Sequence, residues 1–309
     1  MPPRPTLIDC DPGTDDAIAL WLALASPELD VRLVSAVGGN VALAHTLANA
    51  RAIVGLSGRP VPVVSGSDRP LLGRYAFAAD VHGDNGLGGL RLPEGPPVAP
   101  GLAMDVIRAM LRAAAPESVT LVGIGPATNL ALVLATEPAL ADRIAEIVLM
   151  TGAWGEGNAT PSAEFNAWND PEALAIVLAC GRPITLATLD LTNQALCTPA
   201  HMAALRAAGQ GACARAAASI WESVALSERS GGLGHEQHDA CAIAWLVAPH
   251  LFTCRPAFAE VDLGPGPCRG RTVIDRWGRI GSAPNVRLLE TLDAERFFPF
   301  LIERLAGLP

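Results

Sequence analysis

The sequence lacks a long hydrophobic run. No uninterrupted apolar stretch of about twenty residues, the length that a membrane-spanning helix needs, occurs among its 309 residues. Charge is also scarce, because only 17% of the residues are charged, the net charge is −9, and the 22 Lys and Arg residues are scattered. Nucleic-acid binding needs a basic surface. We therefore expect neither a membrane partner nor a nucleic-acid partner.

Cysteine usage and the N-terminus exclude further classes. The seven cysteines form no CxxC pair, and an odd number without such pairs argues against a disulfide framework or a zinc ribbon. Residues 1–5 lead directly into the first predicted strand and leave no room for a signal peptide. We therefore expect buried thiols and a cytoplasmic protein. Without an internal repeat or a clear linker, residues 1–309 are expected to form one domain.

Four carboxylates fall within eight residues near the N-terminus. They lie between an apolar strand signal at 6–8 and an apolar helix signal at 17–24, with Pro12-Gly13 making the turn. They are Asp9, Asp11, Asp15 and Asp16. Helix capping explains one or two of them, but four gathered carboxylates repel each other unless a cation or protons neutralise them. Oxygen ligands favour a hard cation, Ca²⁺ or Mg²⁺.

Strand and helix signals alternate over about the first 190 residues, which predicts a Rossmann-like α/β fold with a mostly parallel sheet flanked by helices. The predicted strands are 6–8, 31–37, 61–64, 119–124, 144–150 and 184–189, and the predicted helices are 17–24, 41–56, 104–114, 127–135 and 172–180. Helices are expected at 199–227 and 240–247. A small antiparallel set at 257–263, 271–277 and 285–291 and a helix at 294–305 follow.

Ligands bind such sheets outside the carboxyl ends of the strands. Asp11, Asn40, Ile124 and the loop after Met150 all lie at such ends. Asn40 by itself is typical of a helix N-cap.

Two histidines, His82 and His238, lie in sequence contexts that are compatible with a role in a functional site. His82 lies in the long Gly- and Pro-rich stretch 65–100 and is either a surface residue or part of a site wall or lid. The pair His238-Asp239 at a helix start is either a simple cap or the source of a proton donor and a further metal ligand.

The chemistry that unites these residues is hydrolysis at a sugar carbon. A hard cation can bind vicinal hydroxyls and acidify a water molecule, while a carboxylate serves as general base. Asn158, Glu164 and Asn166 suit the remaining hydroxyls. This set fits attack of water on a glycosidic carbon through an oxocarbenium-like state.

The sequence resembles the nucleoside hydrolases of the inosine-uridine-preferring type over nearly its whole length. The most specific motif is the run Asp9-Cys10-Asp11-Pro12-Gly13-Thr14-Asp15-Asp16-Ala17. Further matching segments are Gly39-Asn40, 125–129, 156–160, 163–166, 170–173 and His238-Asp239. The resemblance implies the nucleoside hydrolase fold and cleavage of ribonucleosides to free base and ribose.

The resemblance also implies roles for individual residues. Ca²⁺ would be held by Asp11, Asp16, Asp239 and the main-chain carbonyl of Ile124, with Asp11 as general base on the Ca²⁺-bound water. The ribose would be bound by Asp15, Asn40, Asn158, Glu164 and Asn166, with Met150 lining its pocket. His238 would protonate the leaving base, and His82 would belong to the base pocket. A homodimer or homotetramer acting in nucleoside salvage or catabolism is implied as well.

Two departures from the family pattern concern the helix start and the nucleobase. Ala240 stands where the family usually has proline, which should change little at a helix start. Segment 227–237 contains no aromatic residue, although relatives often place a tyrosine there, and the only tyrosine is Tyr75. Trp154 or His235 is expected to compensate. The choice between purine and pyrimidine stays open, with His238 favouring the broad inosine-uridine type.

Three alternatives remain at this point. A haloacid-dehalogenase-type phosphatase would carry Asp-x-Asp on its first strand, but Pro12 and the Asp15-Asp16 pair break that pattern. A non-catalytic, metal-dependent ribose- or nucleoside-binding protein would bind ribosides without releasing base. A hydrolase of a related N-riboside, such as nicotinamide riboside, would share every ribose contact.

Overall fold

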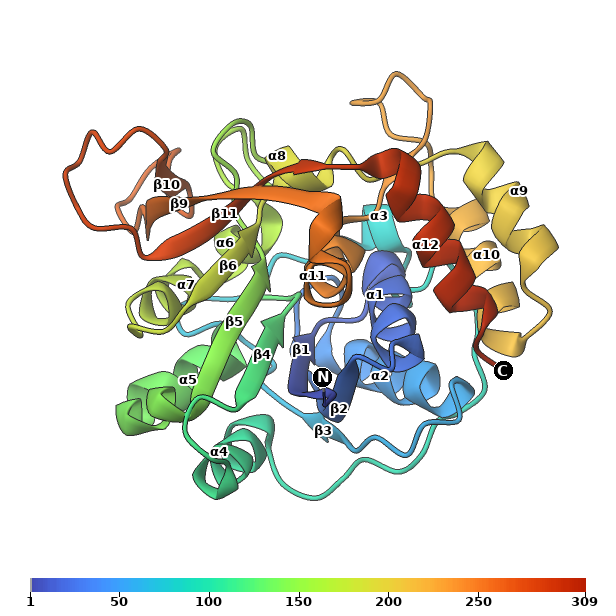
Figure 1. Cartoon of the computed structure of the whole chain (residues 1–309), viewed down its shortest axis with the longest axis horizontal. Helices are drawn as coiled ribbons and strands as arrows, with labels where there is room; N and C mark the ends of the chain where they lie inside the picture. Colours follow the sequence, from blue (N-terminus) through green and yellow to red (C-terminus); the bar gives the residue numbers. More distant parts are fainter. Residues whose placement is uncertain (1) are drawn as a thin grey trace.

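One sheet of nine strands runs through the part of the protein that the computed structural model describes, residues 2–309 (Figure 1). The strand order is β10-β9-β11-β6-β5-β4-β1-β2-β3. The strands are β1 (Arg4–Cys10), β2 (Leu29–Ala36), β3 (Val63–Ser65), β4 (Val119–Gly123), β5 (Ile144–Met150), β6 (Ile184–Ala187), β9 (Phe252–Val261), β10 (Thr272–Asp275) and β11 (Val286–Leu292). Strands β11, β6, β5, β4, β1, β2 and β3 are parallel to one another. Strand β9 runs antiparallel to both of its neighbours, β11 and β10.

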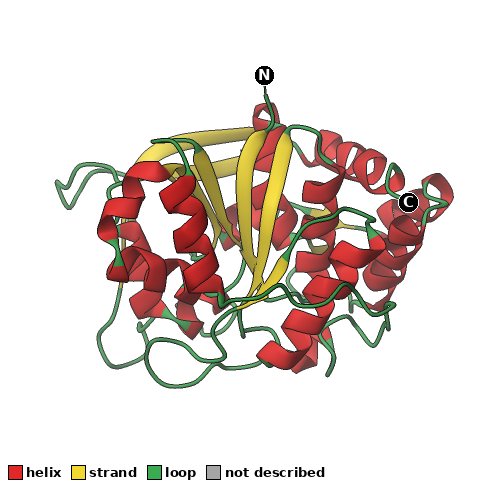
Figure 2. Cartoon of the chain, turned by 90° about the horizontal axis from the view of Figure 1, so that it is seen from below, coloured by secondary structure: helices red, strands yellow, loops and turns green. Residues whose placement is uncertain are grey.

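Helices cover both faces of this sheet (Figure 2). The longer helices are α1 (Thr14–Ala25), α2 (Leu43–Leu56), α4 (Ala103–Ala113), α5 (Thr128–Thr136), α7 (Pro171–Leu178), α9 (Pro199–Ala208), α10 (Ala212–Ser223), α11 (His238–Val247) and α12 (Ala294–Ala306). The short ones are α3 (Ala79–His82), α6 (Phe165–Asn169), α8 (Leu189–Thr192), η1 (Pro138–Arg143) and η2 (Pro249–Leu251). A separate two-stranded pair joins β7 (Leu196–Cys197) to β8 (His235–Glu236).

Alternation along the strands divides the hydrophobic core between the two faces. Successive strand residues point to opposite sides. Leu7 accordingly packs in the cluster formed with α4, α5 and α7, and Ile8 packs in the cluster formed with α1, α10, α11 and α12. Both faces of the central strands are therefore covered, which leaves the strand ends as the place where polar groups can reach a ligand.

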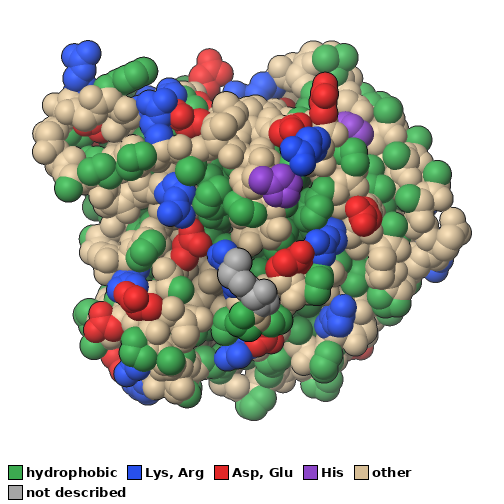
Figure 3. Space-filling view, in the orientation of Figure 1, with side chains coloured by type: hydrophobic (Ala, Val, Ile, Leu, Met, Phe, Trp, Pro, Cys, Tyr) green, Lys and Arg blue, Asp and Glu red, His purple; other side chains and the backbone are tan. Residues whose placement is uncertain are grey.

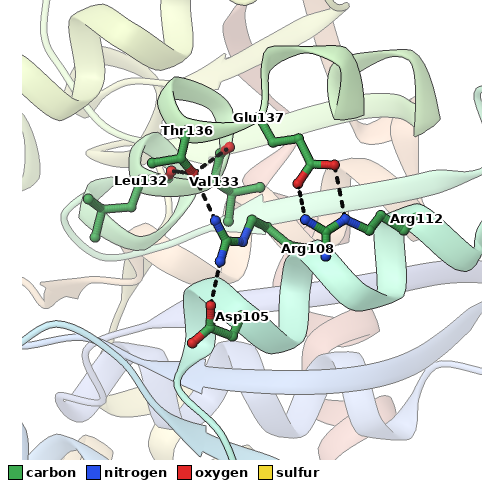
Figure 4. A network of polar contacts seen from close by, with 7 residues as sticks. All are labelled: Asp105, Arg108, Arg112, Leu132, Val133, Thr136 and Glu137. Atoms are coloured by element: carbon green, nitrogen blue, oxygen red, sulfur yellow. Dashed lines mark hydrogen bonds and ion pairs between the residues drawn. The ribbon is translucent and has the colours of Figure 1, made fainter.

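One ion pair and one hydrogen bond connect α4 to the end of α5, away from those strand ends. Arg112 pairs with Glu137, and Arg108 donates to the hydroxyl of Thr136 at 3.3 Å and pairs with Asp105 (Figure 4). These side chains largely face solvent, where an ion pair contributes little to stability. They fix α4 against the end of α5 and play no part in the site.

The fold predicted from sequence is confirmed, with three local differences. Strand β11 pairs in parallel with β6 and antiparallel with β9, so the C-terminal strands extend the central sheet. Strand β6 ends at Ala187, and the short helix α8 already begins at Leu189. The stretch 65–100 contains the single helical turn α3.

The surface agrees with the low charge of the sequence. On the face shown in Figure 3, basic and acidic side chains are scattered among apolar and uncharged groups. None of the helices between residues 2 and 309 combines the length and hydropathy that a transmembrane segment requires.

Candidate active site

The predicted site residues converge on one cavity of about 550 Å³ at the carboxyl ends of the central strands. Its lining includes ten of them, namely Asp15, Asn40, Ile124, Met150, Asn158, Glu164, Asn166, His82, His238 and Asp239. Asp11 and Asp16 do not line the cavity. Both are fully buried and contact Asn40, which does.

Asp11 has one carboxylate oxygen with a partner and one without. Its Oδ2 accepts the main-chain N–H of Asn40 at 2.7 Å, whereas Oδ1 is buried and accepts no hydrogen bond from the described residues. A Cβ at Gly39 or at Gly125 would lie 2.0 Å from Oδ2 or 2.5 Å from Oδ1. Glycine is therefore required at both positions so that the backbone can enclose this carboxylate. At Gly39 the close approach is to Asp11 rather than to a ligand.

Asp16 links the turn after β1 to the start of α1. Its Oδ2 accepts the N–H of Gly13 at 2.9 Å and the side-chain amide of Asn40 at 3.0 Å, and its Oδ1 accepts the N–H of Asp11 at 3.2 Å. The bond from Gly13 satisfies one of the free amides of the first helical turn. Asp16 is thus a capping residue and is also held in place beside Asp11.

Three carboxylates form a group that could hold a metal ion. Oxygen atoms of Asp15, Asp16 and Asp239 lie within 4.8 Å of one another. Burial, reinforced by the neighbouring carboxylates, raises the pKa of Asp16 to about 7 and that of Asp239 well above its ordinary value. Burial likewise raises the pKa of Asp11. This set of oxygen donors, in which Asp16 and Asp239 are buried and Asp15 is half-buried, fits a hard cation, which would replace the protons.

The stability of the fold should therefore depend on a bound hard cation and on pH together. Unfolded carboxyl groups ionise near pH 4, whereas folded Asp16 keeps its proton up to about pH 7. The metal-free folded state thus binds more protons than the unfolded state between these values, and its stability falls as the pH rises. We expect the rise in Tm on adding Ca²⁺ to be larger at about pH 8 than at about pH 5, measured by thermal unfolding against a chelator. An equal rise at both values, or an unchanged rise in Asp239→Asn, would contradict the site.

Two of the three histidines that line the cavity, His82 and His238, are each oriented by a threonine. The main-chain N–H of Thr14 donates to His82 Nδ1 at 3.2 Å. Because an N–H can only donate, Nδ1 carries a lone pair and neutral His82 carries its proton on Nε2. Burial lowers the pKa of His82, which favours that neutral form. His238 Nδ1 lies 2.7 Å from the hydroxyl of Thr192, which leaves Nε2 of His238 as the nitrogen free to act on a ligand.

Two of the groups expected to bind ribose, Glu164 and Asn166, are held at the start of α6. Glu164 caps this helix by accepting the N–H groups of Asn166 at 2.7 Å and Ala167 at 2.9 Å. The side-chain amide of Asn166 donates to the carbonyls of Ile124 at 3.2 Å and Met150 at 3.0 Å, and so joins the ends of β4 and β5. These bonds occupy the Asn166 N–H groups and leave its Oδ1 as the atom that can accept a hydroxyl.

An apolar wall that sequence reasoning missed completes the cavity. It comprises Phe77, Val81, Phe165, Trp168 and Leu226, of which Phe77 and Val81 are 55% and 57% exposed. Exposed apolar side chains gathered at a pocket are typical of a surface that contacts a ligand. The sequence did contain a signal for this wall, namely the aromatic residues that adjoin the predicted polar groups, above all Phe165 and Trp168.

Of the two residues expected to replace the missing tyrosine, only His235 lines the cavity, and both of its ring nitrogens already have partners. Trp154 is not among the residues that line the cavity, and its ring stacks against the guanidinium of Arg276, 4.5 Å away. The expectation for Trp154 is therefore wrong. His235 does line the cavity, but its Nε2 donates to the carbonyl of Trp221 at 3.1 Å and its Nδ1 contacts Gln237 at 3.2 Å.

Comparisons with known proteins agree with this geometry. Residues 6–299 match the family model of the inosine-uridine preferring nucleoside hydrolases. The pyrimidine-specific ribonucleoside hydrolases RihA of Klebsiella pneumoniae and Salmonella gallinarum are 42% and 41% identical, over 98% and 97% of this chain and 98% of each relative. The solved purine-preferring ribonucleoside hydrolase from Gardnerella vaginalis superposes with a TM-score of 0.91 at 30% identity, over 98% of both chains. The chain therefore belongs to the family of inosine-uridine preferring nucleoside hydrolases, enzymes that hydrolyse ribonucleosides to free base and ribose.

Proposed function

We propose that this cavity hydrolyses the N-glycosidic bond of pyrimidine ribonucleosides, with Asp11 as general base, His238 as general acid and Ca²⁺ as cofactor. The observation that carries the proposal is the buried, unpartnered Oδ1 of Asp11, a residue bonded to Asn40 of the cavity lining. A buried oxygen without a partner costs free energy, so its retention favours a function in binding or catalysis.

Asp11 would take a proton from the attacking water molecule. Its Oδ2 is fixed by the N–H of Asn40, so Oδ1 is the atom available for this transfer. Burial raises the pKa of Asp11, and a general base works best when its pKa lies near the operating pH. A bound Ca²⁺, held by Asp11, Asp16, Asp239 and the carbonyl of Ile124, would lower the pKa of water and bind sugar hydroxyls.

The ribose would lie between Glu164 and Asn166 at the start of α6 and the carboxylates of Asp15, Asp16 and Asp239. Asp15, Asn40, Asn158, Glu164 and Asn166 would bind its hydroxyls, and Met150 would contact its ring. The cavity lining supports this, since all six side chains contribute to it. Fixing the sugar in one orientation stabilises the oxocarbenium-like transition state relative to free substrate.

His238 would donate a proton to the leaving base, and His82 would face the base. The contact of His238 Nδ1 with Thr192 supports this, because it leaves Nε2 for proton transfer. Neutral His82, with its proton on Nε2, can donate a hydrogen bond to a base carbonyl. A base that leaves without protonation departs as an unstable anion, so the acid lowers the barrier.

Pyrimidine ribonucleosides are proposed as substrates because both RihA relatives described above, at 41% and 42% identity, are named pyrimidine-specific. The purine-preferring Gardnerella enzyme shares only 30% of the sequence. A purine ribonucleoside is the second candidate, supported by the apolar wall of the cavity.

Release of free base and ribose from a panel of ribosides tests this proposal. The panel contains uridine, cytidine, inosine, adenosine, guanosine and nicotinamide riboside. We expect kcat/KM for uridine and cytidine to exceed that for inosine by about tenfold or more, the ratio that about 1.4 kcal/mol of differential binding gives. Preference for inosine or guanosine would favour the second candidate. Binding of ribosides without release of any base would contradict catalysis at this site.

Further features of the whole protein are part of the same proposal. We propose that residues 1–309 fold as one nucleoside hydrolase domain, which the match over 6–299 supports. A cytoplasmic homodimer or homotetramer without nucleic-acid or membrane partners is proposed with it. Size-exclusion chromatography with light scattering tests the oligomer, and a monomeric mass would contradict it.

A further inference from the structure

One side of the cavity is formed by residues 76–82, here called the base-side wall. Ala76, Phe77, Ala78, Asp80, Val81 and His82 all contribute to the cavity lining. The only regular structure in this segment is the four-residue helix α3. A single helical turn is not stable by itself. The position of the wall must therefore depend on bonds from other parts of the protein.

The side chain of Asn169 supplies two such bonds. Its Oδ1 accepts the N–H of Ala76 at 2.7 Å, and its Nδ2 donates to the carbonyl of Ala76 at 3.2 Å. One amide thus pairs with both main-chain polar groups of a single residue, as a neighbouring strand would. Asn169 is 5% exposed, so water competes little for these bonds.

The neighbours of Ala76 are fixed as well, which places Phe77 between held residues. The Tyr75 hydroxyl lies 2.8 Å from the hydroxyl of Thr128, and the N–H of Ala78 donates to the carbonyl of Asn40 at 2.8 Å. Phe77 therefore projects from a backbone that is held before it and after it. Without the two bonds to Ala76, the backbone directly before Phe77 would lose its attachment to Asn169.

Asn169 is also the last residue of α6, the helix that begins at the polar side of the cavity. Glu164 caps the first turn of α6, and Asn166 follows it. This five-residue helix thus connects groups that would bind ribose to the segment that would face the base. Asn169 itself neither lines the cavity nor belongs to the group of Asp15, Asp16 and Asp239, and it reaches the cavity through its bonds to Ala76.

We propose that Asn169 is a positioning residue that sets the base-side wall and thereby the discrimination between nucleobases. The proposal rests on the proposed function, hydrolysis of ribonucleosides in this cavity. Its effect should appear at the base and not at the sugar, because the side chain of Asn169 hydrogen-bonds to Ala76 and not to any of the proposed ribose-binding residues. A residue that only stabilised the fold would affect both equally.

Asn169→Ala and a matched control test the proposal. Asn285 accepts the N–H of Ala259 at 2.8 Å and donates to its carbonyl at 2.9 Å, the same pair of bonds on strand β9 and outside the cavity lining. Asn285→Ala therefore removes an equivalent interaction elsewhere. In Asn169→Ala we expect KM for the preferred nucleoside to rise about tenfold and the ratio of kcat/KM between uridine and inosine to shift by at least about threefold. Inhibition by free ribose should not change.

Hydrogen exchange provides a readout that does not need activity. The amide of Ala76 should exchange at least about tenfold faster in Asn169→Ala than in the wild type, and should be unaffected in Asn285→Ala. Faster exchange of the Ala76 amide in Asn169→Ala with an unchanged uridine-to-inosine ratio of kcat/KM would overturn the proposal. An equal shift of that ratio in Asn285→Ala would overturn it as well. If the wild type released no base from any riboside, the proposed function would fail, and with it the role in specificity. The exchange result would then show separately whether Asn169 holds Ala76.

Discussion

Asp11→Asn should lower kcat for release of base and ribose by about a thousandfold, within the range that loss of a general base gives. The amide keeps an oxygen that can accept the N–H of Asn40, so the enclosure by Gly39 and Gly125 is preserved. What is lost is the basic Oδ1. The measurement is steady-state release of ribose from the preferred nucleoside in saturating Ca²⁺.

Two variants separate the role of Asp11 as base from its role as a metal ligand. Asp16→Asn removes a carboxylate of the candidate metal group, so its activity should recover in part with excess Ca²⁺, whereas Asp11→Asn should not recover. Asp9→Asn is the matched control, because Asp9 is a buried carboxyl group two residues before Asp11, near the end of β1. Asp9 accepts bonds from Ser35 and Asn129 and does not line the cavity. Full activity of Asp11→Asn, or an equal loss in Asp9→Asn, would contradict the assignment.

His238→Ala should have the second largest effect, a loss of about a hundredfold or more in kcat for natural nucleosides. The reason is that the base then departs without a proton. A riboside with 4-nitrophenolate as leaving group needs no protonation, so its hydrolysis should change by only a few-fold. The comparison of the two substrates in one variant measures acid catalysis separately from folding.

Thr192→Val provides the graded control for this prediction. It removes the hydroxyl that lies 2.7 Å from His238 Nδ1 and leaves the imidazole in place. A loss smaller than that of His238→Ala, again confined to natural nucleosides, is expected. Equal loss of both substrates in His238→Ala would show that His238 does not act as the acid.

The sequence alone predicts those parts of the site that are determined by local sequence patterns. The motif from Asp9 to Asp16 is contiguous, and a strand followed by a turn and a helix start predicts where its carboxylates lie. Asn40 and Ile124 were found because parallel strands end at the same edge of a sheet. The buried, unpartnered oxygen of Asp11 is consistent with that reasoning.

The base side of the cavity could not be derived in the same way. Residues 76–82 have no periodic pattern, and their position depends on a side chain 93 residues away, the amide of Asn169. Trp154 follows a strand end like several residues that line the cavity, but its main-chain N–H donates to Asp190 at 2.8 Å and its ring stacks on Arg276 instead. Long-range contacts of this kind leave no signal in a single sequence.

We propose that the carboxylates at this cavity hold the calcium ion that hydrolysis of ribonucleosides requires. The most direct test follows ribose release from uridine by the purified enzyme before chelation, after chelation, and after Ca²⁺ is restored. This proposal predicts that chelation abolishes release and that Ca²⁺ restores it in the wild type but not in Asp11→Asn. Release that continues unchanged in the chelated enzyme would contradict it.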